Sequence, residues 1–393
     1  MLRFPLPGPA ERSSQARFVP HLEALEVRTV PSYVFSSFDN PNAGTLPGQG
    51  TGAFGINEQG DIVGAYTDPT FAPLGFLLGR GQYTTINDPN EAPFFPQSAL
   101  GINTLGNVVG MYTDSNIMAH GFLYRNGQYT TLDDPNAGGG GTVAAGINEL
   151  GQVAGYYFDP VGTIHGFLLN AGHYTTLDDP NAGTTTSEGT YALGVNSLGQ
   201  VVGQYVDSSF HTHGFLLSFG HYTTLDDPNA TNLTVAEGIN EFGQVVGYYQ
   251  DGTTVHGFLY SFSHFTTLDD PNAGIFGGTQ AGGINSSGDI VGFYVDVNGV
   301  EHGFLAKPEL GGFAASPTGH GGGRLDEINT GQSSSASLVQ GTLNRDQTHS
   351  PLGGIGQDMR GRIELFFAAR LTASQQTSRS GDNPFGGNEE LIF

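Results

Sequence analysis

The stretch "AAGINELGQVAGYYFDPVGTIHGFLLNAGHYTTLDDPNA", from Ala144 to Ala182, is one copy of a unit that recurs along most of the chain. Its "GIN" tripeptide returns with steps of 46, 45, 48, 44 and 45 residues, counted between the glycines. These glycines are Gly55, Gly101, Gly146, Gly194 (followed by Val195), Gly238 and Gly283. A near-constant period of this length indicates a repeat architecture, so the fold class follows from the secondary structure of one unit.

Each unit contains four short runs that are typical of β-strands. In the quoted copy they lie in "AAGIN", "QVAGYYF", "HGFLL" and "HYTTL", and Gly, Asn, Asp or Pro separates them. Four short strands in one period fit a β-propeller blade, whereas a solenoid coil usually needs only about 20 to 30 residues. An open array of β-units is the alternative. The first strand carries small residues in one column, as a crowded central axis requires: Ala53, Ala99, Ala144, Ala192, Ala236 and Ala281.

The array begins in the middle of a unit. The segment "FSSFDNP", Phe35 to Pro41, matches the fourth-strand segment "YTTLDDP" at Tyr174 to Pro180, and the last unit stops at "HGFLA", which ends at Ala306. If the N-terminal strand completes the last unit, no half-blade with an unpaired edge remains. The sequence therefore predicts an all-β, six-bladed β-propeller over residues 31–308 that is closed by its N-terminal strand.

The composition changes on both sides of this array. Residues 1–30 are predicted to form a targeting or linker segment without a packed core. Residues 309–393 are rich in Gly, Ser, Thr and Gln, which predicts a disordered tail. The pattern over Met359 to Leu371 is compatible with one amphipathic helix, and a transient structure without a partner is the favoured interpretation of it.

The charge balance and the cysteine count exclude several classes of protein. There are 13 Lys plus Arg against 37 Asp plus Glu, so the net charge of -24 argues against nucleic acid and anionic membranes as partners. The chain has no cysteine, which excludes disulfides, thiol nucleophiles and thiolate metal sites. No run approaches 18 consecutive apolar residues, and "MLRFPLPGPAERSSQ" lacks the apolar core of a secretory signal. We expect no transmembrane segment and a monomer.

The repeat resembles the bacterial extracellular HAF family, whose unit runs from a "GIN-x-x-G-x-V-V-G" segment to a His-Ala-Phe tripeptide. In this chain the tripeptide is His-Gly-Phe, and Leu74 replaces His in the first unit. The resemblance covers Tyr33 to Ala306. It implies an extracellular or cell-surface propeller and brings no catalytic residues. The segment "HLEALEVRTVPS", His21 to Ser32, resembles a short motif that precedes the first domain of many secreted or surface proteins of one bacterial phylum, which also favours export.

One face of the predicted ring collects acidic and histidine side chains. The second and fourth strands of a meander run in the same direction, so their C-terminal ends emerge on one face, where the third strand also begins. The candidate ligand-binding residues at these positions are Asp68, Asp114, Asp133, Asp134, Asp159, Asp178, Asp179, Asp207, Asp226, Asp227, Asp269, Asp270, His120, His165, His213, His256 and His302.

Three interpretations of this face remain open. Asp before Pro-Asn commonly forms Asx turns, and a His at a hairpin can bond an Asp, so a structural role is the simplest. Clustered carboxylates also suit Ca²⁺, although "DDPNA" lacks the Asp-x-Asp-x-Asp-Gly spacing of a known calcium loop. Zinc is less favoured, because one His per unit spreads the ligands around a ring wider than a tetrahedral site. No other cofactor is predicted.

A column of tyrosines stands two residues before the acids that follow the second strands. We expect these rings to pack between blades with the hydroxyl bonded to a neighbour, and carbohydrate stacking is the alternative. The members are Tyr66, Tyr112, Tyr157, Tyr205, Tyr249 and Tyr294.

The symmetry of the repeats bears on function. Catalysis needs unlike residues around one substrate, but the breaks in the repeat are mild: Leu74, Arg80, Asn87, Arg125 and Glu237. No phosphate-binding loop, nucleophile elbow or metalloprotease helix is present in the sequence. The sequence predicts a non-catalytic binding or scaffold module for a surface glycan or a protein. The alternative is a carbohydrate-active hydrolase or lyase that uses carboxylates on the acidic face.

Overall fold

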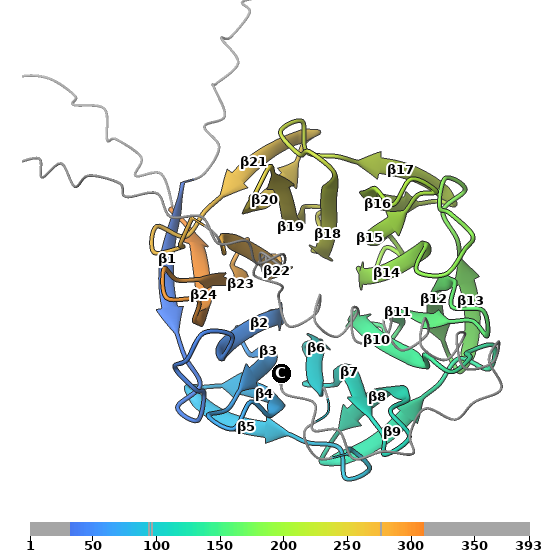
Figure 1. Ribbon diagram of the computed structural model, residues 1–393, viewed down its shortest axis with the longest axis horizontal. Coiled ribbons are helices and arrows are strands. Elements are labelled where there is room, and N and C mark those ends of the chain that lie inside the picture. Colours follow the sequence, from blue (N-terminus) through green and yellow to red (C-terminus); the bar gives the residue numbers. More distant parts are fainter. Residues whose placement is uncertain (1–31, 93–94, 96, 276, 310–393) are drawn as a thin grey trace, which may run out of the picture.

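The computed structural model describes residues 32–92, 95, 97–275 and 277–309, which form a ring of four-stranded antiparallel units around a central axis (Figure 1). Single parallel bridges join some neighbouring units, so that the strands form one sheet of 8, one of 12 and one of 4 strands. This part of the chain contains 24 strands and no helix, hence none that could cross a bilayer. Each four-stranded unit is one sequence repeat, and there are six such units, which confirms the predicted propeller. The flanks predicted at 1–30 and 309–393, and the amphipathic pattern at Met359 to Leu371, lie outside the described residues except for Glu309.

The strands fall into four sets by their position in a blade. The first, nearest the axis, are β2 (Gly50–Ile56), β6 (Ser98–Ile102), β10 (Thr142–Ile147), β14 (Gly189–Val195), β18 (Leu233–Ile239) and β22 (Thr279–Ile284). The second are β3 (Ile62–Thr67), β7 (Val108–Thr113), β11 (Val153–Phe158), β15 (Val201–Val206), β19 (Val245–Asp251) and β23 (Ile290–Val295). The third are β4 (Pro73–Gly79), β8 (Ala119–Arg125), β12 (Ile164–Asn170), β16 (Thr212–Ser218), β20 (Thr254–Ser261) and β24 (Glu301–Pro308). The outer strands are β5 (Gln82–Ile86), β9 (Gln128–Leu132), β13 (His173–Leu177), β17 (His221–Leu225), β21 (His264–Leu268) and β1 (Tyr33–Phe38). We number the blades 1 to 6 in the order in which their first strands occur.

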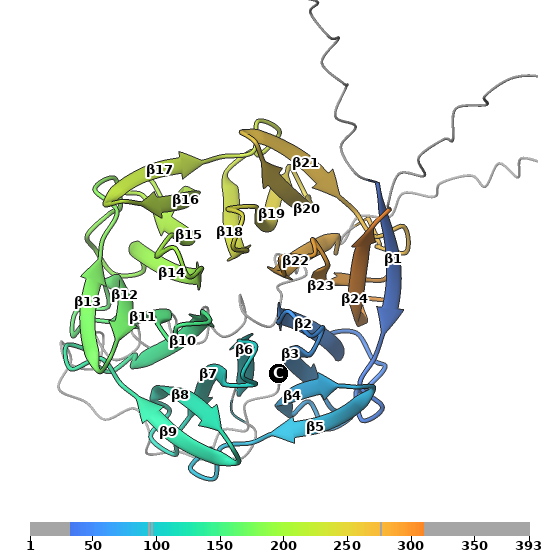
Figure 2. The ribbon, with the colours of Figure 1, turned by 180° about the vertical axis from the view of Figure 1, so that it is seen from behind.

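The N-terminal strand closes the ring, as the split repeat predicts. Strand β1 pairs antiparallel with β24 from Tyr33↔Pro308 to Phe38↔Gly303. It lies outside β24 in both views of the ring (Figure 2). Phe35 also packs edge-on against Phe304, with ring centroids 5.3 Å apart. The last blade therefore joins the two ends of the array.

The core lies within and between the blades. Three of the six second strands, β3, β7 and β11, are buried throughout, because neighbouring blades cover both faces of each blade. Strands β15 and β23 are buried up to Tyr205 and Tyr294. The Phe of each "GF" pair in the third strand is fully buried. Gly155 in the second strand makes room for one of these rings, since a Cβ there would meet the ring of Phe167 at 2.5 Å and the carbonyl oxygen of Val143 at 2.2 Å. The repeated Gly and Phe are thus a matched pair.

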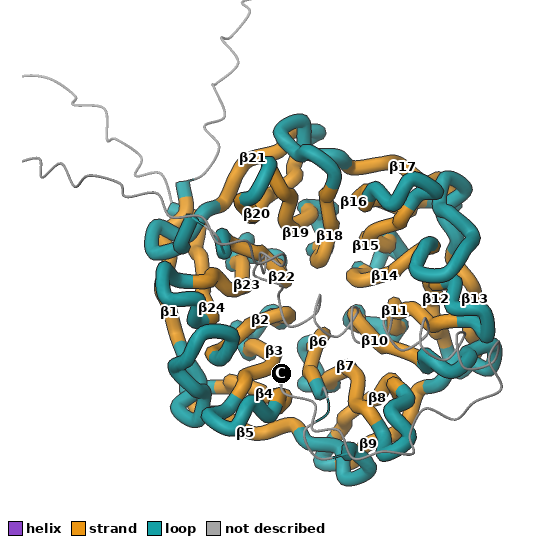
Figure 3. Tube along the Cα trace, viewed as in Figure 1, coloured by secondary structure: helices purple, strands orange, loops and turns teal. Residues whose placement is uncertain are grey.

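Loops and turns join the strands of the ring (Figure 3), and they lie on two faces of different construction. The hairpins between second and third strands and the connections between blades form one face, which we call the Asp face. The hairpins between first and second strands and between third and outer strands form the other, which we call the Asn face. The antiparallel order of each sheet dictates this division.

The Asn face carries a closed ring of hydrogen bonds. The buried Asn after each first strand donates from Nδ2 to the backbone oxygen of the corresponding Asn in the next blade, at 3.0 to 3.3 Å. Around the ring, each residue donates to the next in the order Asn57, Asn103, Asn148, Asn196, Asn240, Asn285 and back to Asn57. Each Oδ1 also accepts from the backbone of its own turn, as Asn148 does from Gln152 N–H at 2.9 Å. These bonds link every blade to its neighbours near the axis.

Candidate functional site

The structure brings the acids and the histidines of the Asp face together within each blade. In blade 3, His165 begins the third strand, and its Nδ1 lies 3.0 Å from Asp178 after the outer strand. Its Nε2 lies 3.7 Å from Asp159 after the second strand. We call this arrangement the Asp–His–Asp cluster. It recurs as Asp114–His120–Asp133, Asp207–His213–Asp226, Asp251–His256–Asp269 and Asp296–His302–Asp39.

The acid that follows the second strand is fixed by its own turn. Asp159 Oδ1 accepts the backbone N–H groups of Val161 and Thr163, at 2.9 and 2.8 Å. In blade 4 the N–H bond from His211 is the main reason why the pKa of Asp207 is lowered. Burial opposes the shift at Asp114, but bonds from Met118 and Asn116 still lower its pKa. The lowered pKa favours the ionised form of Asp114 and Asp207. In Asp114, Asp159 and Asp207 it is Oδ2 that lies toward the histidine.

Two of the cluster histidines, His120 and His256, have a raised pKa. The hydrogen bond from Asp133 raises the pKa of His120, and the charges of Asp133 and Asp114 add to this effect. Burial alone would lower the pKa of His256, but the bond to Asp269 and the nearby carboxylates raise it. In these two clusters the neighbouring carboxylates therefore favour the protonated imidazole.

The tyrosine column supports the histidines and is not exposed. Tyr157 stacks on His165 with ring centroids 5.2 Å apart and is only 5% exposed. The hydroxyl of Tyr249 lies 3.1 Å from Thr267 Oγ1 in the same blade. A buried ring with one face against an imidazole offers no platform for a sugar, so the packing interpretation holds and carbohydrate stacking on these rings is wrong.

The second Asp of each "DD" pair is buried, whereas the first is partly exposed. Asp134 is 3% exposed, and its Oδ1 accepts from Asn136 N–H at 2.9 Å, which is the predicted Asx turn. Its Oδ2 has no hydrogen-bond partner among the described residues, and the same holds for Asp88, Asp179, Asp227 and Asp270. Burial raises the pKa of Asp179 and of Asp270. Of the predicted ligand-binding acids, Asp133, Asp178, Asp226 and Asp269 therefore reach solvent, whereas Asp134, Asp179, Asp227 and Asp270 do not.

Blade 1 has lost the cluster. Leu74 pairs with Tyr66 where the other blades have His, and Asn87 replaces the outer acid. Asp68 remains, and it accepts the N–H groups of Thr70 and Ala72 in its turn. In the connection that follows, burial and the charge of Asp88 raise the pKa of Glu91 to about 7. Without an imidazole in this blade, an outer acid would have no partner at this position.

Blade 4 has gained a second histidine. His211 Nδ1 lies 3.7 Å from Asp207 Oδ2, which also faces His213 Nε2 at 3.6 Å. A cavity of about 130 Å³ lies beside the two imidazoles, between blades 4 and 5, and Asp226 and Asp227 also line it. His211 is not among the residues predicted from the repeat, because the repeat has one His per blade, although the His-x-His spacing in "HTH" is visible in the sequence.

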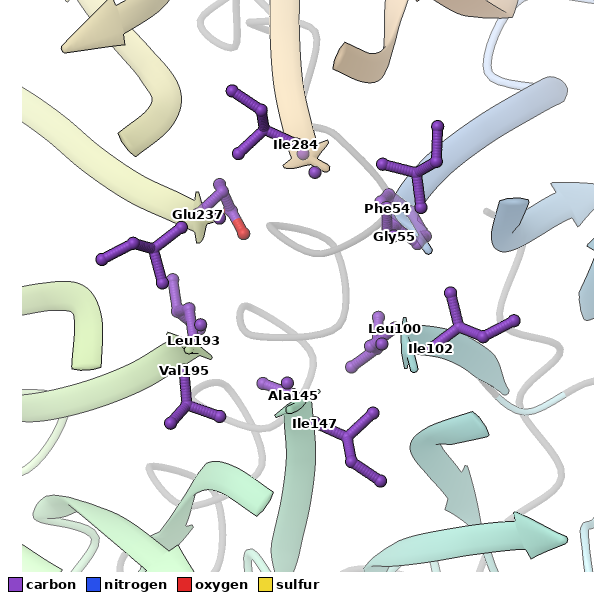
Figure 4. Close-up of a pocket in the computed structure, with 18 residues that line it drawn as sticks. Phe54, Gly55, Leu100, Ile102, Ala145, Ile147, Leu193, Val195, Glu237 and Ile284 are labelled. Carbon is purple, nitrogen blue, oxygen red and sulfur yellow. The ribbon is translucent and has the colours of Figure 1, made fainter. Parts of the chain in front are cut away.

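The central channel is narrow and mostly apolar. The residue before each "GI" or "GV" faces the axis, including Phe54, Leu100, Leu193 and Glu237 (Figure 4). The cavity there measures about 70 Å³, well below the roughly 300 Å³ at which small-molecule sites begin. The axis is therefore a packed seam, and the Asp face holds the polar chemistry.

The comparisons with known proteins concern the fold. Neither the protein-family models nor the curated proteins match the sequence. Among solved structures, a lectin of Aleuria aurantia, described as a six-bladed β-propeller that recognises fucose, shares 13% identity over 64% of this chain and 89% of its own, with a TM-score of 0.40. TolB of Acinetobacter baumannii shares 9% over 63% of each chain, with a TM-score of 0.42. A gluconolactonase of Xanthomonas campestris shares 12% over 67% of this chain and 88% of its own, with a TM-score of 0.40. At these identities and TM-scores the likeness says nothing about the ligand of this chain.

Proposed function

We propose that this protein is a non-catalytic binding module that recognises a hydroxyl-rich ligand, a surface glycan, through the Asp face. The observation that carries the proposal is the recurrence of one partly exposed Asp–His–Asp cluster in five of the six blades. The outer acids of these clusters are between 44% and 50% exposed. They offer carboxylate oxygens, which are strong acceptors for ligand hydroxyl groups.

The loops of the two faces support recognition on this side. The spacing from the Pro after the acids to the next "GIN" glycine is 14, 12, 11, 14, 10 and 12 residues. On the Asn face, by contrast, each buried Asn precedes its turn glycine by three residues in every blade. Binding residues usually lie on variable loops that a rigid scaffold positions. Repeated sites on one face would also raise the affinity for a repetitive ligand through multivalency.

The symmetry disfavours an enzyme. A hydrolase or lyase needs an acid and a base in unlike environments around one bond. The Asp–His–Asp clusters repeat the same three groups in five blades, and each imidazole lies between two carboxylates, as in blades 3 and 4. We therefore assign them to ligand contact and to loop support.

The test is a glycan-binding screen of the full chain, run with and without Ca²⁺, followed by affinity measurements on the best glycan. Replacing the outer acids together (Asp39→Asn, Asp133→Asn, Asp178→Asn, Asp226→Asn and Asp269→Asn) is expected to weaken binding at least tenfold. The control removes three charges from the Asn face, with Glu58→Gln, Glu149→Gln and Glu241→Gln, and leaves binding unchanged.

Three other outcomes would each contradict a part of the proposal. Binding that survives the loss of the outer acids would remove the Asp face as the recognition surface. Cleavage of the bound glycan would replace the binding module with a carbohydrate-active hydrolase or lyase. Absence of glycan binding, together with capture of a surface protein that the acid variant loses, would change the ligand class to protein.

We also propose that the protein acts outside the cell or at the cell surface, as a monomer. The resemblance of its repeats to the HAF family and the "HLEALEVRTVPS" segment support export. Ring closure by β1 supports a monomer, because no half-blade is left to pair with a second copy. Cell fractionation and light scattering test these two statements.

A further inference from the structure

Blade 4 differs from the other blades by one metal-ligating side chain. His211 stands two positions before His213 in the hairpin between β15 and β16. In the other blades the residue two positions before the repeat His or Leu74 is Ala72, Met118, Thr163, Thr254 or Val300. Only one of the six repeats in the described ring thus places a second imidazole beside the turn acid.

Three potential ligand atoms converge at this hairpin. Asp207 Oδ2 lies 3.7 Å from His211 Nδ1 and 3.6 Å from His213 Nε2, and all the atoms lie within 4.8 Å of one another. In a tetrahedral zinc site with bonds of about 2.0 to 2.1 Å, ligand atoms lie roughly 3.3 Å apart. The His211 side chain is 49% exposed. A small rotation of this one exposed ring therefore completes the set.

The other two ligands are already held in place. Asp207 uses Oδ1 to accept the N–H groups of Ser209 and His211, at 2.8 and 2.9 Å, so Oδ2 is left toward the imidazoles. His213 bonds Asp226 through Nδ1 at 2.9 Å and stacks on Tyr205 at a centroid distance of 4.9 Å. A proton on Nδ1 leaves the lone pair of Nε2 facing Asp207. This carboxylate–histidine support is the usual arrangement behind a metal-bound imidazole.

The cavity next to these ligands supplies an independent observation. Both histidines line it, and so does Asp227, which is 3% exposed. Asp227 Oδ2 has no hydrogen-bond partner among the described residues. Other blades of the described ring also bury an unpartnered Asp oxygen at this place, but in blade 4 the Asp lines a cavity that two imidazoles also line. Water on a metal ion in this cavity would give Asp227 a hydrogen-bond donor.

We propose that blade 4 binds one divalent transition-metal ion of the zinc class through Asp207, His211 and His213. Two imidazoles and one carboxylate select Zn²⁺ and its neighbours over Ca²⁺, which takes six to eight oxygen ligands. Three protein ligands leave one position of a tetrahedral site open toward the cavity. The inference rests on the geometry of blade 4 and does not depend on the proposed glycan binding.

The test uses the full chain without an affinity tag, dialysed against a chelator and titrated with Zn²⁺ by calorimetry. One ion per chain is expected, and Co²⁺ in its place should give the visible absorption of a tetrahedral complex. His211→Thr, which installs the residue of blade 3, should weaken binding at least tenfold. Asp226→Asn should weaken it by about tenfold or less, because it removes only the support of His213.

Two further variants separate this site from general histidine binding. His165→Gln removes the equivalent repeat histidine of blade 3 and should leave the Zn²⁺ affinity unchanged. Met118→His adds the missing imidazole to blade 2 and should raise the stoichiometry to two. The proposal is overturned if the full chain binds no Zn²⁺, if His211→Thr binds as tightly as the parent, or if His165→Gln loses the ion.

Discussion

The two faces of the propeller are built by the same repeats but differ in how strictly they repeat. On the Asn face every blade donates one amide to the next, and the bond lengths vary only from 3.0 to 3.3 Å. On the Asp face the blades diverge: blade 1 has Leu74 and Asn87, and blade 4 adds His211. Blade 6 has Asn40 where the others bury an Asp. The residues that link the blades are therefore the same in every repeat, whereas the residues of the Asp face differ between blades.

The largest loss of stability is expected from removal of β1, the strand that closes the ring. Deletion of residues 31–43 removes β1, exposes β24 as an edge and loses the packing of Phe35 on Phe304. We expect the melting temperature to fall by roughly 10 °C or more, measured by calorimetry. A peptide with the sequence of residues 32–42, added in excess, should restore part of the loss by strand addition.

One result would contradict ring closure. A deletion variant that melts like the full chain would show that β1 contributes no closure. The matched control is deletion of residues 311–393, which follow the last strand and should leave the melting temperature within about 2 °C of the parent.

The next effect breaks the Asn face alone. Asn196→Ala removes the donor to Asn240 O at 3.1 Å and the acceptor for Gln200 N–H at 3.0 Å, at a buried position. We expect a loss of about 2 to 3 kcal/mol in the free energy of unfolding, measured with urea, because buried backbone groups are left unpaired. Leu198→Ala in the same hairpin is the control, and this exposed side chain should change stability by less than about 0.5 kcal/mol. Equal losses in the two variants would refute the amide ring as a stabilising element.

A pH effect is expected from blade 1 on the other face. Burial and Asp88 raise the pKa of Glu91 from 4.5 to about 7. A group with a raised folded-state pKa contributes stability that is complete below its unfolded pKa and is lost as the pH rises through the folded pKa. The parent should therefore lose on the order of 1 kcal/mol between pH 4.5 and pH 7, after discounting for solvent screening.

Glu91→Gln isolates this contribution. The variant should lack that part of the pH dependence and be the more stable protein above pH 7, in urea titrations across the window. Glu149→Gln on the Asn face serves as the control for loss of one carboxylate. If Glu91→Gln keeps the slope of the parent between pH 4.5 and pH 7, the proton on Glu91 is not the cause.

A smaller effect concerns the buried acids of the Asp face. Burial raises the pKa of Asp179, and its Oδ2 has no partner in the described structure. Blade 6 has the neutral Asn40 at the same place, where its Oδ1 makes the same turn bond, to Asn42 N–H at 2.9 Å. Asp179→Asn should therefore stabilise the protein by about 1 kcal/mol at pH 7, and the gain should shrink as the pH falls toward the raised pKa.

The neighbouring acid is the control for this variant. Asp178→Asn weakens the bond to His165 at a half-exposed site and should cost less than about 1 kcal/mol. If Asp179→Asn destabilises the protein at pH 7 instead, the buried carboxylate is satisfied in solution by a cation or a donor. That outcome would bring the acids between the blades into the binding chemistry of the face.

The parts of the molecule that the sequence predicts are those that the repeat states several times. The strand order, closure by the segment at Phe35 and the meeting of His165 with Asp178 all follow from period and direction. The pattern does not predict how deeply each side chain is buried. Asp178 and Asp179 are adjacent and chemically identical, yet only the second is covered by the next blade. The cross-blade bond of Asn196 and the cluster around His211 also depend on distances between elements, which a single sequence does not record.

The smallest effect expected is on the Asn face, at the tips of its outer hairpins. Phe219 occupies a left-handed conformation with φ of 50° and is 92% exposed, so it bears backbone strain without packing. Phe219→Gly relieves a cost of about 1 to 2 kcal/mol, but glycine returns roughly 0.5 to 1 kcal/mol through the entropy of the unfolded chain. A net gain of about 0.5 kcal/mol in the free energy of unfolding is therefore expected in urea unfolding.

Asn126 is the control: it has φ of 51° at the same place in blade 2, and Asn126→Gly should gain less, because Asn tolerates this conformation better than Phe. Equal gains at the two positions would show that the side chain does not set the strain. A loss at Phe219 would show that the exposed ring packs on another part of the chain and that this face, too, has begun to specialise.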